Sequence, residues 1–361
     1  MILVVLVAGG WALFGKGDTQ TGPIRIGASL PLTGDAASYG EMMRGGIELA
    51  VKEINDQGGI NGRQLEVVYE DDACSPTGGT TAFTKLLDAD QVSAIVGPVC
   101  SPSAAPALPL AQQHHVPTLI IASAPGLTDI GDDIFRIYPS DLLQGKFAAE
   151  YVFNTLGKKK VAILYAKDEW GTGLEKTFSA RFTELGGTIT DSEGADVNAT
   201  DLRTPLTKIK TSNPELVYIP LHASGGVAVA KQSRQLGLAV PLIGGDYFDT
   251  KEFTSVVDTN GIFFTIGKIN NSDDFKARVK AATGVDAGLL TPLGYDGVEI
   301  IASALKQAGT NPEKLRQAIA ATSYTTGVSF PNISFEQNGD LKAAQFEIRV
   351  VKNGKSESYV E

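Results

Sequence analysis

The sequence predicts an α/β protein of two similar lobes, each built around a mostly parallel sheet. Strand-like apolar runs alternate with amphipathic helical runs along the chain, which is the pattern that βαβ units produce. The 361 residues are enough for two domains of about 180 residues each. Apolar residues make up 43% and charged residues 20% of the chain, an ordinary globular composition that argues against disorder.

The first half contains four predicted strands with nearly continuous apolar character, as expected for parallel strands that are covered on both faces. They span residues 24–30, 65–70, 92–96 and 117–121. A helix lies between the first two strands, because Met43, Ile47 and Ile54 recur at the spacing of one helical face. Gly58 and Gly59 end this helix.

A second series of five predicted strands implies a second lobe of similar build. These strands span residues 161–165, 188–191, 216–221, 241–244 and 262–266. Phe178 and Phe182 lie on the apolar face of a helix in this half. The tail differs, because residues 333–335 and 346–351 are predicted to form a hairpin with its turn at residues 338–339, an Asn-Gly pair.

Ligands of open parallel sheets bind beyond the carboxyl ends of the strands. With two facing sheets, this edge is the cleft between the lobes. The loops that follow the predicted strands there span residues 30–39, 97–103, 121–125, 166–173, 222–225 and 245–248. Most of them are rich in glycine, serine and aromatic residues. We therefore expect the functional site in these loops.

Serine and aspartate are the candidate binding groups in these loops. Ser101 and Ser103 at a helix start, and Ser123 beside a loop amide, can hold an anion such as a carboxylate. Helix capping explains the first two serines equally well. Asp246 follows a predicted strand and can face a cation, although a solvated loop aspartate is commoner. Residue types alone leave these alternatives open.

Charge and composition exclude several function classes. A net charge of −10 repels nucleic acid and anionic lipid. Three histidines and two cysteines are too few for an ordinary zinc site, so we expect neither a metal nor a cofactor. The chain has no glycine-rich nucleotide motif and no nucleophile elbow. We therefore expect a protein that is not an enzyme.

The two cysteines lie in loops that follow strand-like runs. In an exported chain, Cys74 and Cys100 would favour a disulfide, with two buried thiols as the alternative. A catalytic thiol is disfavoured, because no motif links a histidine to Cys100.

The amino terminus suggests export. Residues 2–14 are apolar without interruption, which is shorter than the roughly 20 residues of a membrane-spanning helix but typical of an export signal. A buried first strand or helix is the alternative interpretation. We expect residues 1–22 to form an export signal or a membrane tether.

Eight short motifs follow one another from near residue 24 almost to the end of the chain. They are SYG at 38–40, GGING at 58–62, DDAC at 71–74, CS at 100–101, APGLT at 124–128, DLLQG at 141–145, WGTG at 170–173 and NGD at 338–340. Each motif is weak alone, but in this order they resemble the periplasmic Leu/Ile/Val-binding proteins. These are the type I solute-binding proteins of branched-chain amino-acid ABC transporters.

The resemblance implies the type I periplasmic binding protein fold, in which two Rossmann-like lobes are joined by three crossing strands. The crossings would lie near Tyr138, Gly267 and Gly327. It also implies a disulfide between Cys74 and Cys100. The lobes would comprise residues 23–140 with 268–326, and residues 141–267 with 327–361. A periplasmic monomer with an amino-acid ligand and an ABC transporter permease as partner would follow.

The resemblance also implies roles for single residues. Ser101 and Ser123 match the groups that hold the ligand carboxylate, while the Ile121 carbonyl and Asp246 match those that hold the ammonium. Asp141 falls at the hinge side of the second lobe. The side-chain pocket would be lined by Tyr39, Val99, Cys100, Trp170, His222 and Leu290.

Two pocket positions depart from the family pattern. The family's leucine binder has tyrosine where this chain has Trp170 and His222, so the ligand side chain stays open. A sensing domain of the same fold, which binds amides or aromatic carboxylates without transport, is the competing hypothesis. Export favours the transport reading, and a ligand without an amine would leave Asp246 without its partner.

Overall fold

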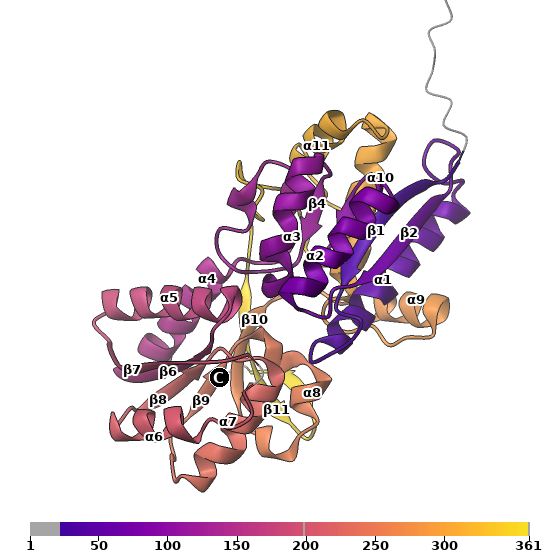
Figure 1. Cartoon of the computed structure of the whole chain (residues 1–361). Helices are drawn as coiled ribbons and strands as arrows, with labels where there is room; N and C mark the ends of the chain where they lie inside the picture. The colour runs from indigo at the N-terminus through magenta and orange to yellow at the C-terminus, as the bar shows by residue number, and fades with distance from the viewer. Residues whose placement is uncertain (1–21, 198, 360–361) are drawn as a thin grey trace, which may run out of the picture.

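The computed structural model describes residues 22–197 and 199–359, which form two lobes with a helix-covered sheet in each (Figure 1). The predicted export signal or tether lies outside these residues except for Gly22. No helix within the described ranges is long and apolar enough to cross a bilayer.

The sheet of the first lobe has five parallel strands in the order β2-β1-β3-β4-β5 among the described residues. Their bounds are β1 (Ile24–Leu30), β2 (Leu65–Asp71), β3 (Ile95–Val96), β4 (Thr118–Ile120) and β5 (Ile134–Arg136). β1 is buried at every residue except Arg25, as expected for an inner strand of a covered parallel sheet.

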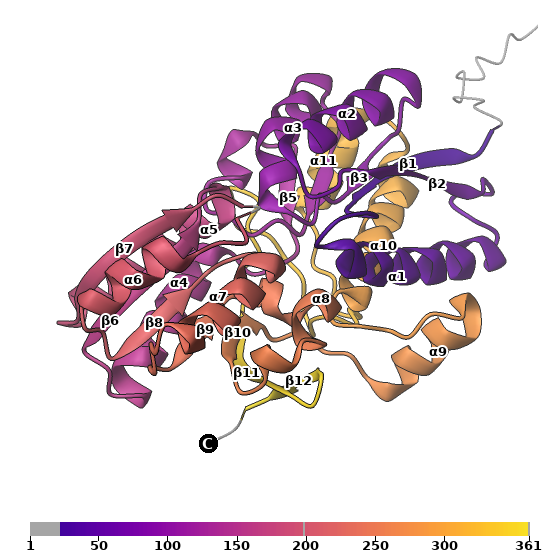
Figure 2. The same ribbon diagram turned by 60° about the horizontal axis from the view of Figure 1, so that its bottom comes forward.

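Helices cover both faces of this sheet, with α2 and α3 on one face and α1 and α10 on the other (Figure 2). Met43 and Ile47 of α1 are fully buried, as their spacing predicts. A second apolar cluster under α2 and α3 includes Phe83, Leu86 and Leu108. The helices are α1 (Ala37–Asp56), α2 (Pro76–Thr84), α3 (Ser101–His114), α9 (Asp273–Thr283), α10 (Thr291–Ala308) and α11 (Pro312–Ala320).

The sheet of the second lobe has seven strands among the described residues, in the order β12-β11-β10-β9-β8-β6-β7. Its strands are β6 (Lys160–Ala166), β7 (Thr188–Ala195), β8 (Leu216–Ile219), β9 (Leu242–Gly244), β10 (Phe263–Gly267), β11 (Phe346–Lys352) and β12 (Lys355–Ser358). β11 pairs antiparallel with both β10 and β12, and the other neighbouring strands pair parallel. Helices α4 and α5 lie on one side, and α6 and α7 on the other (Figure 1). These helices are α4 (Asp141–Glu150), α5 (Glu169–Glu184), α6 (Arg203–Thr211), α7 (Ala223–Gln235) and the short α8 (Lys251–Thr254).

The predicted fold class is confirmed, and each of the nine predicted parallel strands overlaps an observed one. The strand predicted at residues 92–96 shortens to Ile95–Val96. Strand β5 was not predicted, because Ile134–Arg136 is only three residues long and carries no extended apolar run.

The predicted carboxyl-terminal hairpin is wrong. Strand β11 forms its hairpin with β12, and the turn is the second Asn-Gly pair, at residues 353–354. Asn353 and Gly354 both have positive φ, at 50° and 77°, which is the backbone that a tight hairpin turn requires. At the first pair only Gly339 has positive φ, and the turn there links Phe335 to Leu341 by an isolated bridge.

The chain crosses between the lobes after β5, after β10 and again before β11. The last segment stays against the first lobe beyond the expected crossing at Gly327, because Arg136 N donates to Gly339 O at 2.8 Å. It meets the second lobe where Lys268 N donates to Gln345 O at 2.8 Å. We therefore place the third crossing after Gly339 in the proposed division into lobes.

The contact between α1 and α10 depends on a glycine. A Cβ at Gly46 would lie 2.0 Å from the carbonyl oxygen of Thr291, so the helices must separate to admit Gly46→Ala. We expect this substitution to lower the free energy of unfolding by about 1–3 kcal/mol, measured by urea denaturation. Gly45→Ala is the matched control and should be neutral or slightly stabilising, because its Cβ has no neighbour closer than 3.7 Å. Equal losses for both variants would contradict the close-approach argument.

Candidate functional site

A small cavity lies where the two lobes meet. The first lobe and the segment that leaves it supply Tyr39, Val99, Ser101, Ile121, Ser123, Tyr138, Leu289 and Leu290, and the second lobe supplies Trp170, Asp246 and Tyr247. The cavity volume is about 30 Å³, which is room for about two water molecules. The lobes must therefore move apart before an organic molecule can enter.

Two serines on the first lobe line this cavity. Ser101 is the first residue of α3, and its hydroxyl oxygen accepts a hydrogen bond from Ala124 N at 3.1 Å. The hydroxyl hydrogen of Ser101 therefore remains available to donate. Ser123 lies in the loop after β4, and its carbonyl accepts from Asp141 N at 2.8 Å. Ser103 instead donates to the carbonyl of Cys100 at 3.0 Å, as local capping predicts.

Asp246 lines the opposite side of the cavity, on the second lobe. Its side chain accepts a hydrogen bond from the Tyr138 hydroxyl at 3.0 Å, and its backbone carbonyl accepts one from the Tyr39 hydroxyl. Burial raises the pKa of Asp246 to about 6, against the hydrogen bond from Tyr138, which lowers it. An ionised carboxylate here is therefore costly unless a positive charge lies next to it.

A second buried carboxylate belongs to Asp141, the first residue of α4. It is fully buried, and neither of its carboxylate oxygens has a hydrogen-bond partner among the described residues. Burial and repulsion from Asp246 raise the pKa of Asp141 well above its usual range, while Arg136 acts in the opposite direction. Asp141 does not line the cavity, and its interaction with Asp246 is the repulsion between the two carboxylates.

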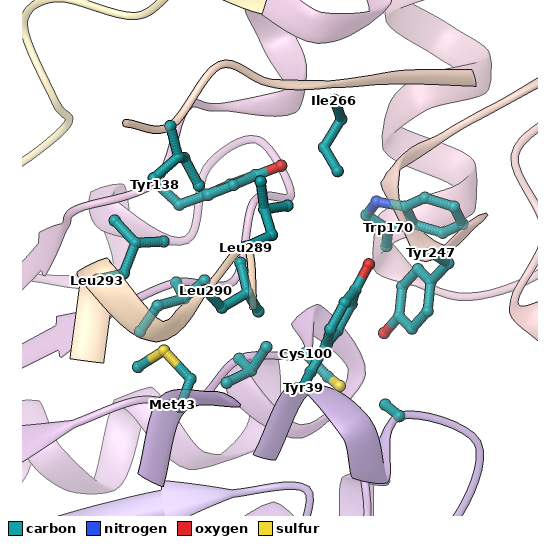
Figure 3. Close-up of a cluster of buried hydrophobic side chains, with 14 of the residues drawn as sticks. Tyr39, Met43, Cys100, Tyr138, Trp170, Tyr247, Ile266, Leu289, Leu290 and Leu293 are labelled. Atoms are coloured by element: carbon teal, nitrogen blue, oxygen red, sulfur yellow. The ribbon is translucent and has the colours of Figure 1, made fainter. Parts of the chain in front are cut away.

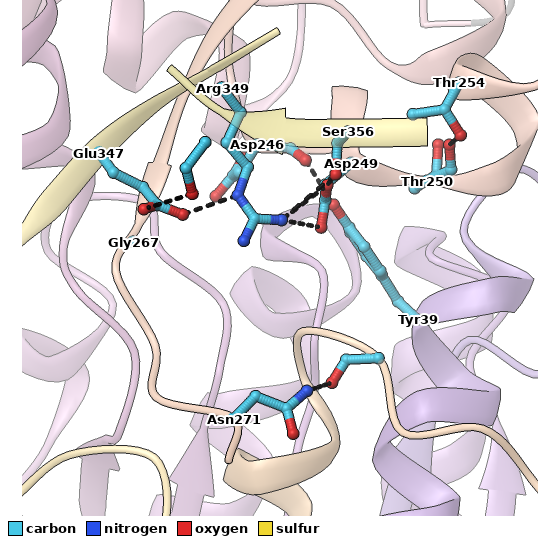
Figure 4. Close-up of polar contacts among 12 residues, drawn as sticks. Tyr39, Asp246, Asp249, Thr250, Thr254, Gly267, Asn271, Glu347, Arg349 and Ser356 are labelled. Carbon is cyan, nitrogen blue, oxygen red and sulfur yellow. Dashed lines mark hydrogen bonds and ion pairs between the residues drawn. The ribbon is translucent and has the colours of Figure 1, made fainter. Parts of the chain in front are cut away.

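The short helix η4 (Asp246–Asp249) is anchored to the carboxyl-terminal hairpin (Figure 4). Arg349 of β11 lies 3.3 Å from the Asp249 carboxylate and bonds Glu347 at 2.7 Å. Ser356 of β12 donates to the same carboxylate of Asp249. These bonds fix one end of η4 and thereby the position of Asp246 at its other end.

Aromatic side chains form much of the cavity wall. Figure 3 shows Leu289 and Leu290 on one side of Tyr39, with Trp170 and Tyr247 on the other. The rings of Trp170 and Tyr247 meet edge to face with centroids 4.7 Å apart. The indole nitrogen of Trp170 is buried and has no hydrogen-bond partner among the described residues.

Two residues expected in the side-chain pocket lie outside it. His222 is buried behind Tyr247 and bonds Asp168 at 2.6 Å between Nε2 and Oδ2, so this acid holds the ring away from the cavity. Cys100 caps α3 with its backbone, and its sulfur is joined to Cys74. The predicted disulfide is thus present, and the hydroxyl of Tyr247 lies 3.0 Å from the Cys74 sulfur.

Three lining residues were not among the predicted site residues. Tyr138 was predicted only as a crossing point, although a side chain at a crossing between two lobes can line a cavity between them. Tyr247 follows Asp246 directly, and its signal was an aromatic side chain in the loop at residues 245–248, where the site was expected. Leu289 adjoins the predicted Leu290, and nothing in the sequence distinguishes the two.

The fold and the cavity together define a two-lobed α/β binding protein with its site at the lobe junction. The chain belongs to the periplasmic binding protein family, which matches residues 23–355. It is similar to the leucine-, isoleucine-, valine-, threonine- and alanine-binding protein of Pseudomonas aeruginosa. The two are 31% identical over 337 residues, which cover 90% of this chain and 89% of that protein.

Solved structures of similar proteins agree. The leucine-binding protein LivK from Thermotoga maritima matches with a TM-score of 0.84 and 26% identity, over 93% of this chain and 98% of that one. LivJ from Streptococcus pneumoniae in complex with isoleucine matches with a TM-score of 0.82 and 28% identity, over 93% and 99%. These findings confirm the predicted family and fold, and the family consists of binding proteins, not enzymes. They also place the protein outside the cytoplasm.

The pKa of Asp246 offers a test of this geometry. Tyr138→Phe removes the hydroxyl that bonds the carboxylate, so it should raise the pKa of Asp246 by about one pH unit. The measurement is an NMR titration of the Asp246 carboxyl carbon in the free protein. Tyr39→Phe is the matched control, because the Tyr39 hydroxyl bonds the backbone carbonyl and not the carboxylate. A larger increase for Tyr39→Phe would contradict the assignment.

Proposed function

We propose that the protein captures an amino-acid zwitterion between its lobes outside the cytoplasm and delivers it to an ABC transporter. The observation that carries the proposal is the pairing of two serines on one lobe with a buried carboxylate on the other, around a single cavity. A zwitterion has one charged group for each side. The similar proteins named above bind amino acids according to their names.

In this proposal Ser101 and Ser123 hold the α-carboxylate. Their hydroxyls and the amides at the start of α3 are donors, and a helix amino terminus favours negative charge. The Ile121 carbonyl and Asp246 hold the α-ammonium. Charge-assisted hydrogen bonds contribute about 1.5–3 kcal/mol each, so several of them can supply the roughly 8 kcal/mol of micromolar binding after ordering costs.

Lobe closure follows from the same charges. The ligand first binds the serines of the open first lobe, and closure then brings Asp246 and Trp170 over it and expels water. The positive ammonium replaces Tyr138 as the main partner of the Asp246 carboxylate. Closure is thereby favoured when a cationic group is present, which is the differential interaction that a ligand-driven change requires.

An aromatic carboxylate is the competing ligand for this fold. It would satisfy Ser101 and Ser123, and it would match the aromatic wall. It would also leave the buried carboxylate of Asp246 without a cation, at a cost of several kcal/mol or the uptake of a proton. The proposal therefore favours a ligand with an amine.

Delivery to a transporter needs its own experiment. Deletion of the gene should abolish high-affinity uptake, by intact cells, of the amino acid that the purified protein binds. Uptake that persists after deletion would support the alternative of a sensing domain. The apolar segment at residues 2–14 remains predicted to be the export signal or the tether.

Substitution of Asp246 tests the amino-acid site. Asp246→Asn removes the charge that faces the ammonium and should weaken the best amino acid about 10- to 100-fold, measured by calorimetry against the twenty amino acids and benzoate. Asp258→Asn is the control, because Asp258 forms an exposed ion pair with Arg234 far from the cavity. Unchanged affinity in Asp246→Asn would remove the ammonium role, and preferential binding of benzoate would favour the aromatic ligand.

Binding should also depend on pH in a defined direction. The pKa of Asp246 in the free protein is raised to about 6, mainly by burial, and a bound ammonium would lower it by favouring the ionised form. Affinity should therefore be constant between about pH 7 and 8 and fall by up to tenfold per pH unit below about pH 6. Calorimetry between pH 5 and 8 checks this, and a flat profile would contradict it.

A further inference from the structure

We propose that Tyr247 limits the size of the ligand side chain, so that the site prefers amino acids with small side chains, and that His222 is the positioning residue that holds Tyr247 in place. The inference rests on the proposed amino-acid site and specifies its ligand.

The ligand side chain would face the part of the cavity wall that the charged groups leave free. Once two serines, the Ile121 carbonyl and Asp246 contact the ends of the zwitterion, the remaining wall is apolar and aromatic. It consists of Tyr39, Val99, Tyr138, Trp170, Tyr247, Leu289 and Leu290. Figure 3 shows Tyr247 facing this space from the side opposite the two leucines. A longer ligand side chain must therefore displace one of these walls.

Tyr247 is held on three sides. Its ring stacks on His222 with centroids 4.2 Å apart and planes 18° apart. The edge-to-face contact with Trp170 holds a second side, and the hydroxyl lies 3.0 Å from the Cys74 sulfur. Tyr247 is also the second residue of η4, whose far end Asp249 is anchored to β11 and β12. These contacts oppose movement of the ring away from the cavity.

His222 and Trp170, which contact Tyr247, are themselves held in place. The ring of His222 bonds Asp168 at 2.6 Å, and both side chains are 5% exposed. Asp168 also accepts a hydrogen bond from Gly171 N at 2.8 Å and so caps α5, whose second residue is Trp170. One buried acid thus fixes both the ring behind Tyr247 and the helix that carries the ring beside it.

A rigid wall makes the affinity depend on the size of the ligand side chain. The closed cavity measures only about 30 Å³. Tyr247, Trp170 and His222 belong to the same lobe, so we expect opening to move Tyr39 and Cys74 of the other lobe away while these three rings stay together. In a hydrophobic pocket, one methylene group changes discrimination about 10- to 200-fold. An isobutyl side chain therefore meets a larger penalty here than the methyl group of alanine.

The test is calorimetry of the full chain with glycine, alanine, valine and leucine. The native protein should bind alanine at least about tenfold more tightly than leucine. Tyr247→Leu should change the ratio of the two affinities at least about tenfold in favour of leucine. Tyr247→Phe is the control that keeps the ring and removes only the hydroxyl contact with Cys74, so it should keep the native ratio.

His222 is tested through the same ratio. His222→Gln keeps a donor for Asp168 but removes the stacked ring, so the ratio should shift toward leucine, less than in Tyr247→Leu. His222→Tyr keeps both a ring and a donor and should restore the native preference. A merely structural role for His222 would weaken all four ligands equally and leave the ratio unchanged, which would overturn the positioning role.

The outcomes for the native protein need no variant to fold. Leucine bound as tightly as alanine would overturn the size limit while leaving the amino-acid site intact. Absence of binding for every amino acid would overturn the proposed function itself. An unchanged ratio in a folded Tyr247→Leu variant would overturn the role of Tyr247 alone.

Discussion

The architecture of the site depends on one constraint, which is the cost of keeping the carboxylate of Asp246 ionised between two closed lobes. A buried charge is tolerated only when hydrogen bonds or an opposite charge compensate for lost solvation. Tyr138 supplies one hydrogen bond, and the pKa of Asp246, raised to about 6 by burial, indicates that this compensation is partial. In the proposed function, the unmet part is the free energy available to select a ligand that carries a positive charge.

A second buried acid adds to the negative charge at this junction. Asp141 is buried nearby and its charge repels that of Asp246, which helps to raise the pKa of Asp141. Arg136 moderates this repulsion while it bonds Asp340 at 2.8 Å and the Ala124 carbonyl at 3.0 Å. Arg136 acts on Asp141 and also pairs with Asp340, so this junction is short of positive charge. A cationic group of the ligand would supply it.

Much of the fold follows from the sequence. Covered parallel strands produce apolar runs, and the helices that cover them carry apolar residues at a regular spacing along one face. The failures have local causes. β5 is too short to give a run, and two Asn-Gly pairs in the tail present the same signal, although only the second has the backbone of a hairpin turn. Eight of the site residues named from the resemblance line one cavity. His222 does not, because its bond to Asp168 holds the ring outside the cavity. Asp168 lies 54 positions away in the chain, and no sequence pattern predicts that bond.

The anchoring of η4 has a consequence for how the protein is made. Asp249 is bonded to Arg349 and Ser356, which lie 100 and 107 positions later in the chain. During synthesis, the loop that carries Asp246 emerges long before the strands that hold it. The acidic wall of the cavity therefore reaches its final position only after Arg349 and Ser356 have been made and β11 and β12 have joined the sheet.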